Sequence, residues 1–210
     1  MHDAGLFAAL ILKVMSRLLD RAVDELAKLP GVGDRTALRL ALHLLRQPVE
    51  GVDAFAAALV DFRRNIKFCS RCNNLSDDQL CPICSDATRD RTTICVVEHV
   101  KDVLSIEHTR SYRGLYHVLG GVISPIQGVG PSDLKINMLV DNVRCGQVRE
   151  VILALSTSIE GETTGYYISR QLADTGVKIS TIARGIGFGD EIDYADDITL
   201  VHALSNRTTL

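Results

Sequence analysis

Four cysteines in the first half of the chain constrain its fold more than any other feature. They form two C-x2-C pairs, Cys69 with Cys72 and Cys81 with Cys84, which are separated by eight residues. Each C-x2-C turn brings its two sulfurs to one side, so two such turns can present four thiolates tetrahedrally to one Zn²⁺. The short separation requires the two turns to face each other across a tight hairpin. A site with four protein ligands is closed, and we therefore expect one structural, non-catalytic zinc ion per chain.

Two disulfides, or four unrelated thiols, are the alternatives to a zinc site. Disulfides are rare in proteins that are not secreted, and the apolar stretch Leu6–Leu12 lacks the basic start and the small-residue cleavage site of a secretory signal. No apolar run reaches the length of a membrane span. We therefore expect a cytoplasmic protein. Cys95 lies outside the motif in an apolar run and is expected to be a buried thiol.

The segment before the cysteines has the pattern of two helices joined by a glycine turn. Apolar residues recur at helical spacing over residues 16–29 and 34–45. Pro30 ends the first helix, and the glycines that follow it allow a tight turn. Asp34 is the expected N-cap of the second helix. The buried stripe of that helix is expected to consist of Leu38, Ala41, Leu42 and Leu45.

Two arginines, Arg35 and Arg39, lie four residues apart on the opposite, exposed face of the second helix. The net charge of the chain is −3, so a contact with nucleic acid requires a local basic surface of this kind. Backbone amides at a helix start, with arginines beside them, can bind a phosphate. The motif resembles the helix-hairpin-helix of sequence-independent DNA-binding proteins, which predicts that Arg35 and Arg39 contact DNA. A plain helical hairpin with solvated arginines is the alternative.

A third helix is expected over residues 53–68, leading into the cysteine pairs. Its apolar residues recur at helical spacing and are expected to be buried: Phe55, Ala58, Leu59, Phe62 and Ile66. Four basic residues near its end either extend the phosphate-binding surface or form a solvated face: Arg63, Arg64, Lys67 and Arg71.

From residue 92 onward, short β-branched runs alternate with helical patterns. Strands are expected at residues 93–97, 116–119, 150–155 and 178–182, and helices at 100–108, from the loop 124–132 to about 145, and at 163–175. That alternation is typical of a parallel sheet covered by helices on both faces. Glu98, Glu160 and Glu162 follow the carboxyl ends of expected strands, where open α/β sheets place their functional sites.

This half of the chain resembles the Toprim domain of topoisomerases and primases. That family holds Mg²⁺ with a glutamate after its first strand and an Asp-x-Asp pair after a later one. Glu98 matches the glutamate, but Ser156 and Ser158 stand at the positions of the two aspartates. Hydroxyls are poor replacements for carboxylates as ligands of a hard divalent cation. The sequence therefore favours a binding role over metal-dependent cleavage.

The order of these parts is similar to that of the RecR family of bacterial recombination mediators. The stretches that carry the resemblance are Leu29–Gly33, Cys69–Cys84, Ile94–Glu98, Glu160–Glu162 and Ala183–Ile186. The acidic stretch 187–197 corresponds to the family's Walker-B-like segment. The resemblance implies an α/β multidomain protein with an N-terminal helix-hairpin-helix region (1–65), a four-cysteine zinc finger (66–91), a Toprim-like domain with a mainly parallel sheet (92–184) and a C-terminal Walker-B-like segment (185–210).

The resemblance also implies a non-catalytic, DNA-binding accessory factor in homologous recombinational repair. Such a protein would form a ring-like clamp and act with RecO, and in many bacteria with RecF, to load RecA onto gapped DNA. By position, Arg35 and Arg39 would contact DNA, whereas Glu98, Glu160 and Glu162 would lie on a partner-facing surface. The loop 124–132 is a further candidate for that surface. The first fourteen residues precede the resemblance and are expected to be dispensable, unless they extend the first helix into an oligomer interface.

A metal-dependent Toprim enzyme, such as a nuclease or a primase-like protein, is the competing hypothesis. It requires metal ligands from outside the usual motif, for which the sequence offers Asp190, Asp193, Asp196 and Asp197. A purely structural zinc protein is a third hypothesis, and it leaves Arg35 and Arg39 without a role.

Overall fold

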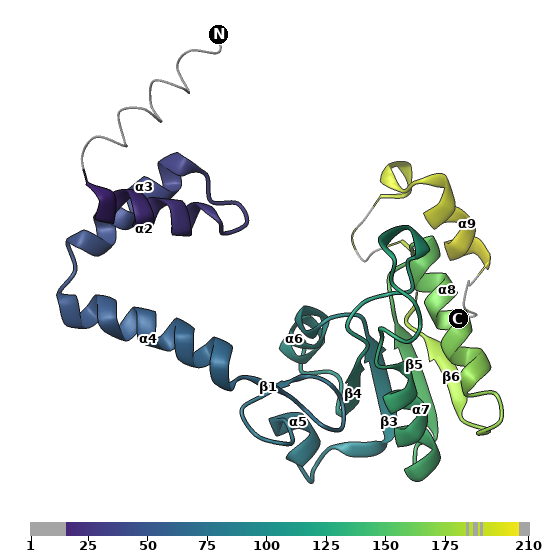
Figure 1. Ribbon diagram of the computed structural model, residues 1–210. Coiled ribbons are helices and arrows are strands. Elements are labelled where there is room, and N and C mark those ends of the chain that lie inside the picture. Colours follow the sequence, from purple (N-terminus) through teal and green to yellow (C-terminus); the bar gives the residue numbers. More distant parts are fainter. Residues whose placement is uncertain (1–15, 184, 187–188, 190, 206–210) are drawn as a thin grey trace. The chain divides into compact units, whose positions relative to one another are not determined.

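The computed structural model describes residues 16–183, 185–186, 189 and 191–205 (Figure 1). The chain divides into two compact units, the first ending at Asn65 and the second beginning at Ile66. The first fourteen residues, which the sequence predicts to be dispensable, lie outside the described part of the chain.

The first unit contains a hairpin of two helices, α2 (Arg17–Ala27) and α3 (Asp34–Leu45). Gly31 in the turn has a φ of +78°, a left-handed conformation that glycine adopts without steric cost. Gly33, and not Asp34, is the N-cap of α3, so the predicted cap is wrong by one residue. Since glycine offers no side-chain acceptor, the first backbone amides of α3 have no side-chain cap.

The hairpin closes over a small core of Val23, Ala37 and Ala41. Of the predicted stripe on α3, Ala41 is buried, but Leu42 and Leu45 are exposed by 37% and 76%. The buried residues of α3 are Ala37 and Ala41, because small side chains fit where two helices approach closely.

Helix α4 (Val49–Asn65) begins and ends earlier than the predicted helix over 53–68. None of its residues is buried, so the expected burial is wrong: Phe55, Leu59 and Phe62 are exposed by 49%, 55% and 58%. Ala58 is exposed as well. Helical periodicity identifies an apolar face but does not supply a surface to cover it, and no described part of this unit does so.

The second unit opens with the cysteine segment. Its elements are a short antiparallel pair, β1 (Lys67–Phe68) and β2 (Leu75–Ser76), and the one-turn helix α5 (Pro82–Ser85). Lys67 and Phe68 therefore belong to a strand and not to the end of the third helix. The antiparallel pair encloses the first cysteine pair, Cys69 and Cys72, and the second pair lies beyond β2.

A four-stranded sheet follows, with the strand order β4-β3-β5-β6 (Figure 1). All of its neighbouring strands are parallel, which confirms the predicted fold class. The strands are β3 (Asp90–Val97), β4 (Gly114–Val118), β5 (Glu150–Ala154) and β6 (Lys178–Thr181), and the helices between them are α6 (Val100–His108), α7 (Ile136–Cys145) and α8 (Ile159–Gln171).

Helices cover both faces of the sheet, as predicted. On one face Leu139 of α7 and Ile168 of α8 pack in one cluster with strand residues such as Val151. On the other face Val103 of α6 packs in a second cluster with Cys95 and its neighbours. Cys95 is 4% exposed, which confirms the predicted buried thiol, and this burial raises its pKa to about 12.

Helix α8 begins at Ile159, earlier than the predicted start at residue 163. The Ser158 side chain caps it by accepting the Gly161 N–H at 3.1 Å. The remaining elements of the described chain are the 3-10 turns η1 (Pro125–Gln127) and η2 (Ile192–Tyr194) and the helix α9 (Asp197–Ser205). Among the described residues, no helix is both long and apolar enough to cross a membrane.

Candidate metal centre and binding surfaces

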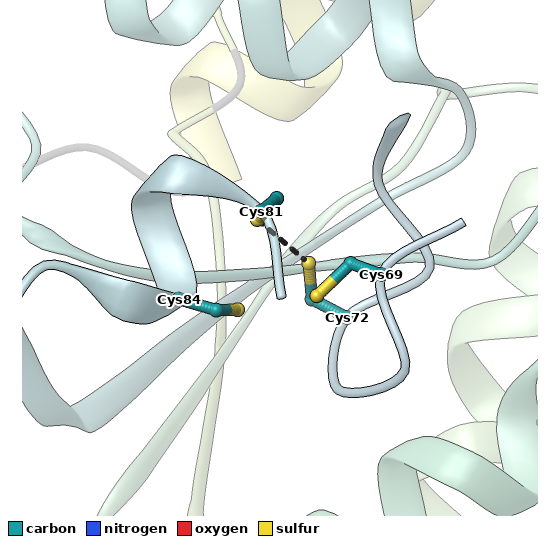
Figure 2. Close-up of side chains that lie close together, drawn as sticks. All are labelled: Cys69, Cys72, Cys81 and Cys84. Carbon is teal, nitrogen blue, oxygen red and sulfur yellow. Dashed lines mark hydrogen bonds between the residues drawn. The ribbon is translucent and has the colours of Figure 1, made fainter. Parts of the chain in front are cut away.

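The first cysteine pair lies in the turn between β1 and β2. The Asn73 N–H donates to the Cys69 carbonyl at 2.9 Å, and the Cys69 N–H donates to the Asn74 carbonyl at 2.7 Å. Asn73 has a φ of 60°, in the left-handed region that asparagine tolerates better than most residues. These bonds fold the chain back on itself within a few residues, which places the Cys69 and Cys72 side chains together (Figure 2).

The second cysteine pair is built on α5. Cys81 is its N-cap and Cys84 lies within it. Pro82 follows Cys81 at a helix start, where its missing N–H leaves no bond unmade. The Ser85 N–H donates to the Cys81 carbonyl at 3.0 Å and closes the turn.

All four thiols converge on one point inside the module (Figure 2). The four sulfur atoms lie within 4.8 Å of one another, and each cysteine is exposed by 2% or less. The sulfurs of Cys72 and Cys81 are 3.6 Å apart, well beyond the roughly 2 Å of a disulfide, and all four thiols are free. The structure therefore brings together all four cysteines that the sequence predicts as metal ligands.

The close packing of these sulfurs shifts their proton affinities in opposite directions. A hydrogen bond from Cys72 lowers the pKa of Cys81, whereas the same contact and burial raise the pKa of Cys72. One thiolate is thus stabilised by the S–H groups of its neighbours. Four thiolates at this distance would repel one another in a buried site, and a bound dication would remove that repulsion.

The donor set fits Zn²⁺. Tetrahedral zinc with Zn–S bonds of about 2.3 Å separates its ligand sulfurs by about 3.8 Å. The 3.6 Å between Cys72 and Cys81 and the 4.8 Å limit for the whole cluster lie on either side of that value. Four buried sulfur ligands leave no position for a substrate, so a metal here would have a structural role.

Arg35 and Arg39 line a shallow groove along α3. The groove has a volume of about 370 Å³, and both arginines are exposed. Two further basic side chains, His43 and Arg46, line it as well. Sequence reasoning missed this pair, although its spacing from Arg39 continues the same helical stripe. The stripe faces away from the hairpin core and can accept a row of phosphates.

The other basic candidates divide between the two units. Arg63 and Arg64 lie exposed in the last turn of α4, in the first unit. Lys67 and Arg71 belong to the cysteine segment of the second unit, where Lys67 is exposed and Arg71 is half-buried.

Glu98 lies directly after β3, at the carboxyl end of the sheet, and its side chain is held in place. The Ser156 N–H, two residues beyond the end of β5, donates to Glu98 Oε1 at 2.6 Å. The hydroxyls of Ser156 and Ser158 are 2.9 Å apart and hydrogen-bonded to each other. Of the residues at the two aspartate positions, Ser156 contacts Glu98 through its backbone amide and Ser158 contacts Ser156, so the site offers hydroxyls and a backbone amide where the Toprim pattern has carboxylates.

Glu160 and Glu162 lie in the first turn of α8, not in a loop before it. Acidic side chains are favourable there because they face the positive end of the helix dipole. Glu162 lines a groove of about 400 Å³ between α8 and strands β5 and β6. The predicted loop 124–132 carries an isoleucine, Ile126, that is 94% exposed.

The four aspartates offered as alternative metal ligands do not form a cluster in the described residues. Asp190 lies outside the described part of the chain. Asp193 lies in η2, whereas Asp196 accepts bonds from Thr199. Among the described residues, the four cysteines are the only group of three or more Cys, His, Asp or Glu side chains close enough to share a metal ion.

Four family models match consecutive parts of the chain. They are a RecR helix-hairpin-helix over residues 19–63, a RecR four-cysteine zinc finger domain over 66–86, a Toprim domain over 92–183 and a RecR C-terminal region over 185–208.

Curated relatives match almost the whole chain. The recombination protein RecR of Porphyromonas gingivalis is 60% identical over 199 residues, which cover 95% of this chain and 96% of the relative. The recombination protein RecR of Bacteroides thetaiotaomicron is 56% identical over 193 residues, 92% of this chain and 94% of the relative. That of Flavobacterium johnsoniae is 54% identical over 192 residues, 91% of this chain and 93% of the relative.

Proposed function

The chain belongs to the RecR family of recombination proteins, and we propose that it is a non-catalytic, DNA-binding mediator of homologous recombinational repair. The residues around Glu98 are the main support for the proposal that the protein is not catalytic. Its neighbours Ser156 and Ser158 supply hydroxyls, and one carboxylate oxygen of Glu98 accepts a backbone N–H. Metal-assisted strand cleavage requires several carboxylates that converge on Mg²⁺.

We propose that the first unit binds DNA without sequence preference. Arg35, Arg39 and Arg46 present a line of positive charge along one groove, and such a line suits phosphates and not base edges. The amides at the start of α3, after the Gly33 N-cap, provide a second phosphate contact.

The clamp-like oligomer is part of the same proposal. Its support is the uncovered apolar surface of the first unit, where Leu59 and Phe62 of α4 and Leu45 of α3 are more than half exposed. An apolar surface of this kind is unfavourable in water and is stabilised when a second copy covers it. In that assembly the protein would act with RecO-like, and where present RecF-like, partners to help load RecA on gapped DNA in the cytoplasm.

One structural zinc ion per chain would be held by Cys69, Cys72, Cys81 and Cys84. When bound, the ion would cross-link the two C-x2-C turns, the first knuckle (Cys69–Cys72) and the second knuckle (Cys81–Cys84), and would neutralise their thiolates. Backbone hydrogen bonds shape each C-x2-C turn, and the ion would hold the two turns to each other.

Glu98, Glu160 and Glu162 are proposed as the partner-binding residues of the Toprim domain. Glu98 lies at the end of β3 and the other two lie in the first turn of α8, so all three follow the carboxyl ends of strands. Carboxylates in this position suit a partner with a basic surface.

A cleavage assay tests the proposal directly. Purified protein is incubated with Mg²⁺ or Mn²⁺ and with nicked, gapped or supercoiled DNA, and binding is measured in parallel as a function of salt. We expect salt-dependent binding and no cleavage or relaxation. Reproducible cleavage that is lost in Glu98→Ala would establish the alternative, a metal-dependent Toprim enzyme.

A further inference from the structure

The cysteine module is bonded to the sheet at its edge strand β4. The Val118 N–H donates to the Cys72 carbonyl at 2.8 Å, and the Asn73 side-chain amide donates to the Val118 carbonyl at 2.9 Å. Both backbone groups of Val118 that face away from β3 are therefore used by the first knuckle. Asn73 is itself buried, so its bond is shielded from competing water.

An apolar contact reinforces the same junction. Ile83, between Cys81 and Cys84, packs against the cysteine cluster and against the clusters on both faces of the sheet. The cysteine module therefore shares the core of the second unit and is not an independently packed domain.

The backbone beyond Val118 leads directly to Glu98. The Leu119 N–H donates to the Val97 carbonyl at 2.9 Å, and the Gly120 N–H donates to the Glu98 carbonyl at 2.9 Å. On its other side, the Glu98 carboxylate accepts the Ser156 N–H at 2.6 Å. Hydrogen bonds and the short backbone segment 118–120 therefore join a predicted metal ligand, Cys72, through Glu98 to Ser156.

We propose that occupancy of the metal centre controls the conformation of the Glu98 site, through Asn73 and Val118. With metal bound, the first knuckle is rigid and holds the carboxyl end of β4, which in turn holds the backbone of Glu98. With metal lost, the knuckle is free to move, Val118 loses its outer partners, and Glu98 and Ser156 become mobile. The inference depends on the proposed zinc centre, but it does not depend on which partner binds Glu98.

The variant Asn73→Gly isolates this connection from the metal itself. Glycine adopts the left-handed backbone of Asn73 without strain and leaves all four cysteines in place, but it cannot donate to Val118. Asn74→Ala is the matched control, because the Asn74 side chain accepts only the Leu75 N–H, at 2.9 Å, within the module.

Amide hydrogen exchange in the metal-loaded, full-length chain measures the effect. In Asn73→Gly we expect exchange at Gly120 and Ser156 to accelerate about fivefold, as the loss of one buried hydrogen bond predicts. The amides of Leu172 and Lys178, which bond elsewhere in the unit, should keep their rates. Asn74→Ala should leave all four rates unchanged.

Removal of the metal from the unaltered chain with a chelator should accelerate amide hydrogen exchange at Gly120 and Ser156 more than the Asn73→Gly substitution does. By reciprocity, Glu98→Ala, which cannot accept the Ser156 N–H, should bind zinc with a lower equilibrium affinity than the unaltered chain. Unchanged exchange at Ser156 in Asn73→Gly, with one zinc bound per chain, would overturn the inference and leave the zinc centre intact. Metal analysis that finds no zinc would instead refute the zinc centre itself.

Discussion

The two units of the molecule use the same kind of amphipathic helix in opposite ways. In the second unit α6, α7 and α8 place their apolar faces on a sheet, so that residues such as Leu139 and Ile168 are fully buried. In the first unit α4 has an apolar face of similar character, but Phe55, Leu59 and Phe62 are each about half exposed or more. The second unit therefore contains its own core, whereas the first presents a face that a second molecule can cover.

Loss of a metal ligand should have the largest effect, and it should be confined to the second unit. Cys72→Ser removes one of four thiolates, and we expect it to release zinc and to lower the free energy of unfolding of this unit by more than about 4 kcal/mol, since metal-binding energy is largely folding energy. Metal analysis and thermal unfolding measure both. Cys145→Ser is the control, because Cys145 is an exposed thiol outside the cluster. Equal zinc content in the two variants would contradict the assignment.

A pair of matched truncations tests the comparison itself. Leu139→Ala, at a position that is 0% exposed, should lower the free energy of unfolding by about 3 kcal/mol, because it opens a cavity in a packed core. Leu59→Ala, at a position that is 55% exposed, should leave the unfolding of an isolated chain within about 0.5 kcal/mol.

The oligomeric state gives the second readout of this pair. If α4 is an interface, Leu59→Asp should dissociate the assembly, as measured by gel filtration with mass detection, and Leu139→Ala should not. A Leu59→Asp variant that keeps the native assembly would show that this face is not covered by another copy.

A buried histidine should make the second unit sensitive to acid. His117 is 1% exposed, and its Nε2–H donates to the Lys135 carbonyl at 2.8 Å, while Nδ1 has no hydrogen-bond partner. Burial lowers its pKa from 6.5 to about 4. The neutral ring therefore contributes stability that is fully present above pH 6.5 and is lost as the pH falls through about 4.

The expected loss between those pH values is about 3 kcal/mol, because each pKa unit corresponds to 1.36 kcal/mol. His117→Gln keeps a donor for the Lys135 carbonyl but cannot titrate. Unfolding of metal-loaded protein at pH 7, 6 and 5 should show a shallower dependence in this variant. Parallel curves for the two proteins would mean that His117 is not the titrating group.

The features that could be predicted from the sequence are those fixed by local spacing. The C-x2-C pairs at Cys69 and Cys81 predict the sulfur cluster because each short turn brings its two sulfurs to one side, and only eight residues separate the two turns. The β-branched runs predict the parallel sheet and place Glu98 at its carboxyl end. The start of α8 at Ile159 could also have been predicted, since Ser158 followed by two acidic residues is a helix N-terminus signal.

The features that could not be predicted depend on what lies opposite a residue in space. The apolar spacing of Phe55, Leu59 and Phe62 is the same whether their cover comes from this chain or from another. The hydrogen bonds from the Cys72–Asn73 knuckle to Val118 join residues far apart in sequence, and no local pattern indicates them. Arg46 continues the stripe of Arg35 and Arg39, but it lies at the end of α3, where a helix boundary is hardest to place.

The smallest expected effect belongs to the exposed arginines of the first unit, and it concerns binding and not stability. Arg35→Ala with Arg39→Ala removes two candidate phosphate contacts from a solvent-exposed groove, so the free energy of unfolding should change by less than about 0.5 kcal/mol. Affinity for DNA should fall, and the slope of log affinity against log salt should flatten by about two units.

Arg17→Ala with Arg21→Ala is the matched control, because these exposed arginines have the same spacing on α2 and lie outside the groove. Addition of Arg46→Ala to the first pair should flatten the slope by about one unit more if the whole stripe follows the DNA backbone. An equal loss in the two double variants would indicate a diffuse effect of net charge, and an unchanged slope in both would move the DNA contacts toward Arg63 and Arg64.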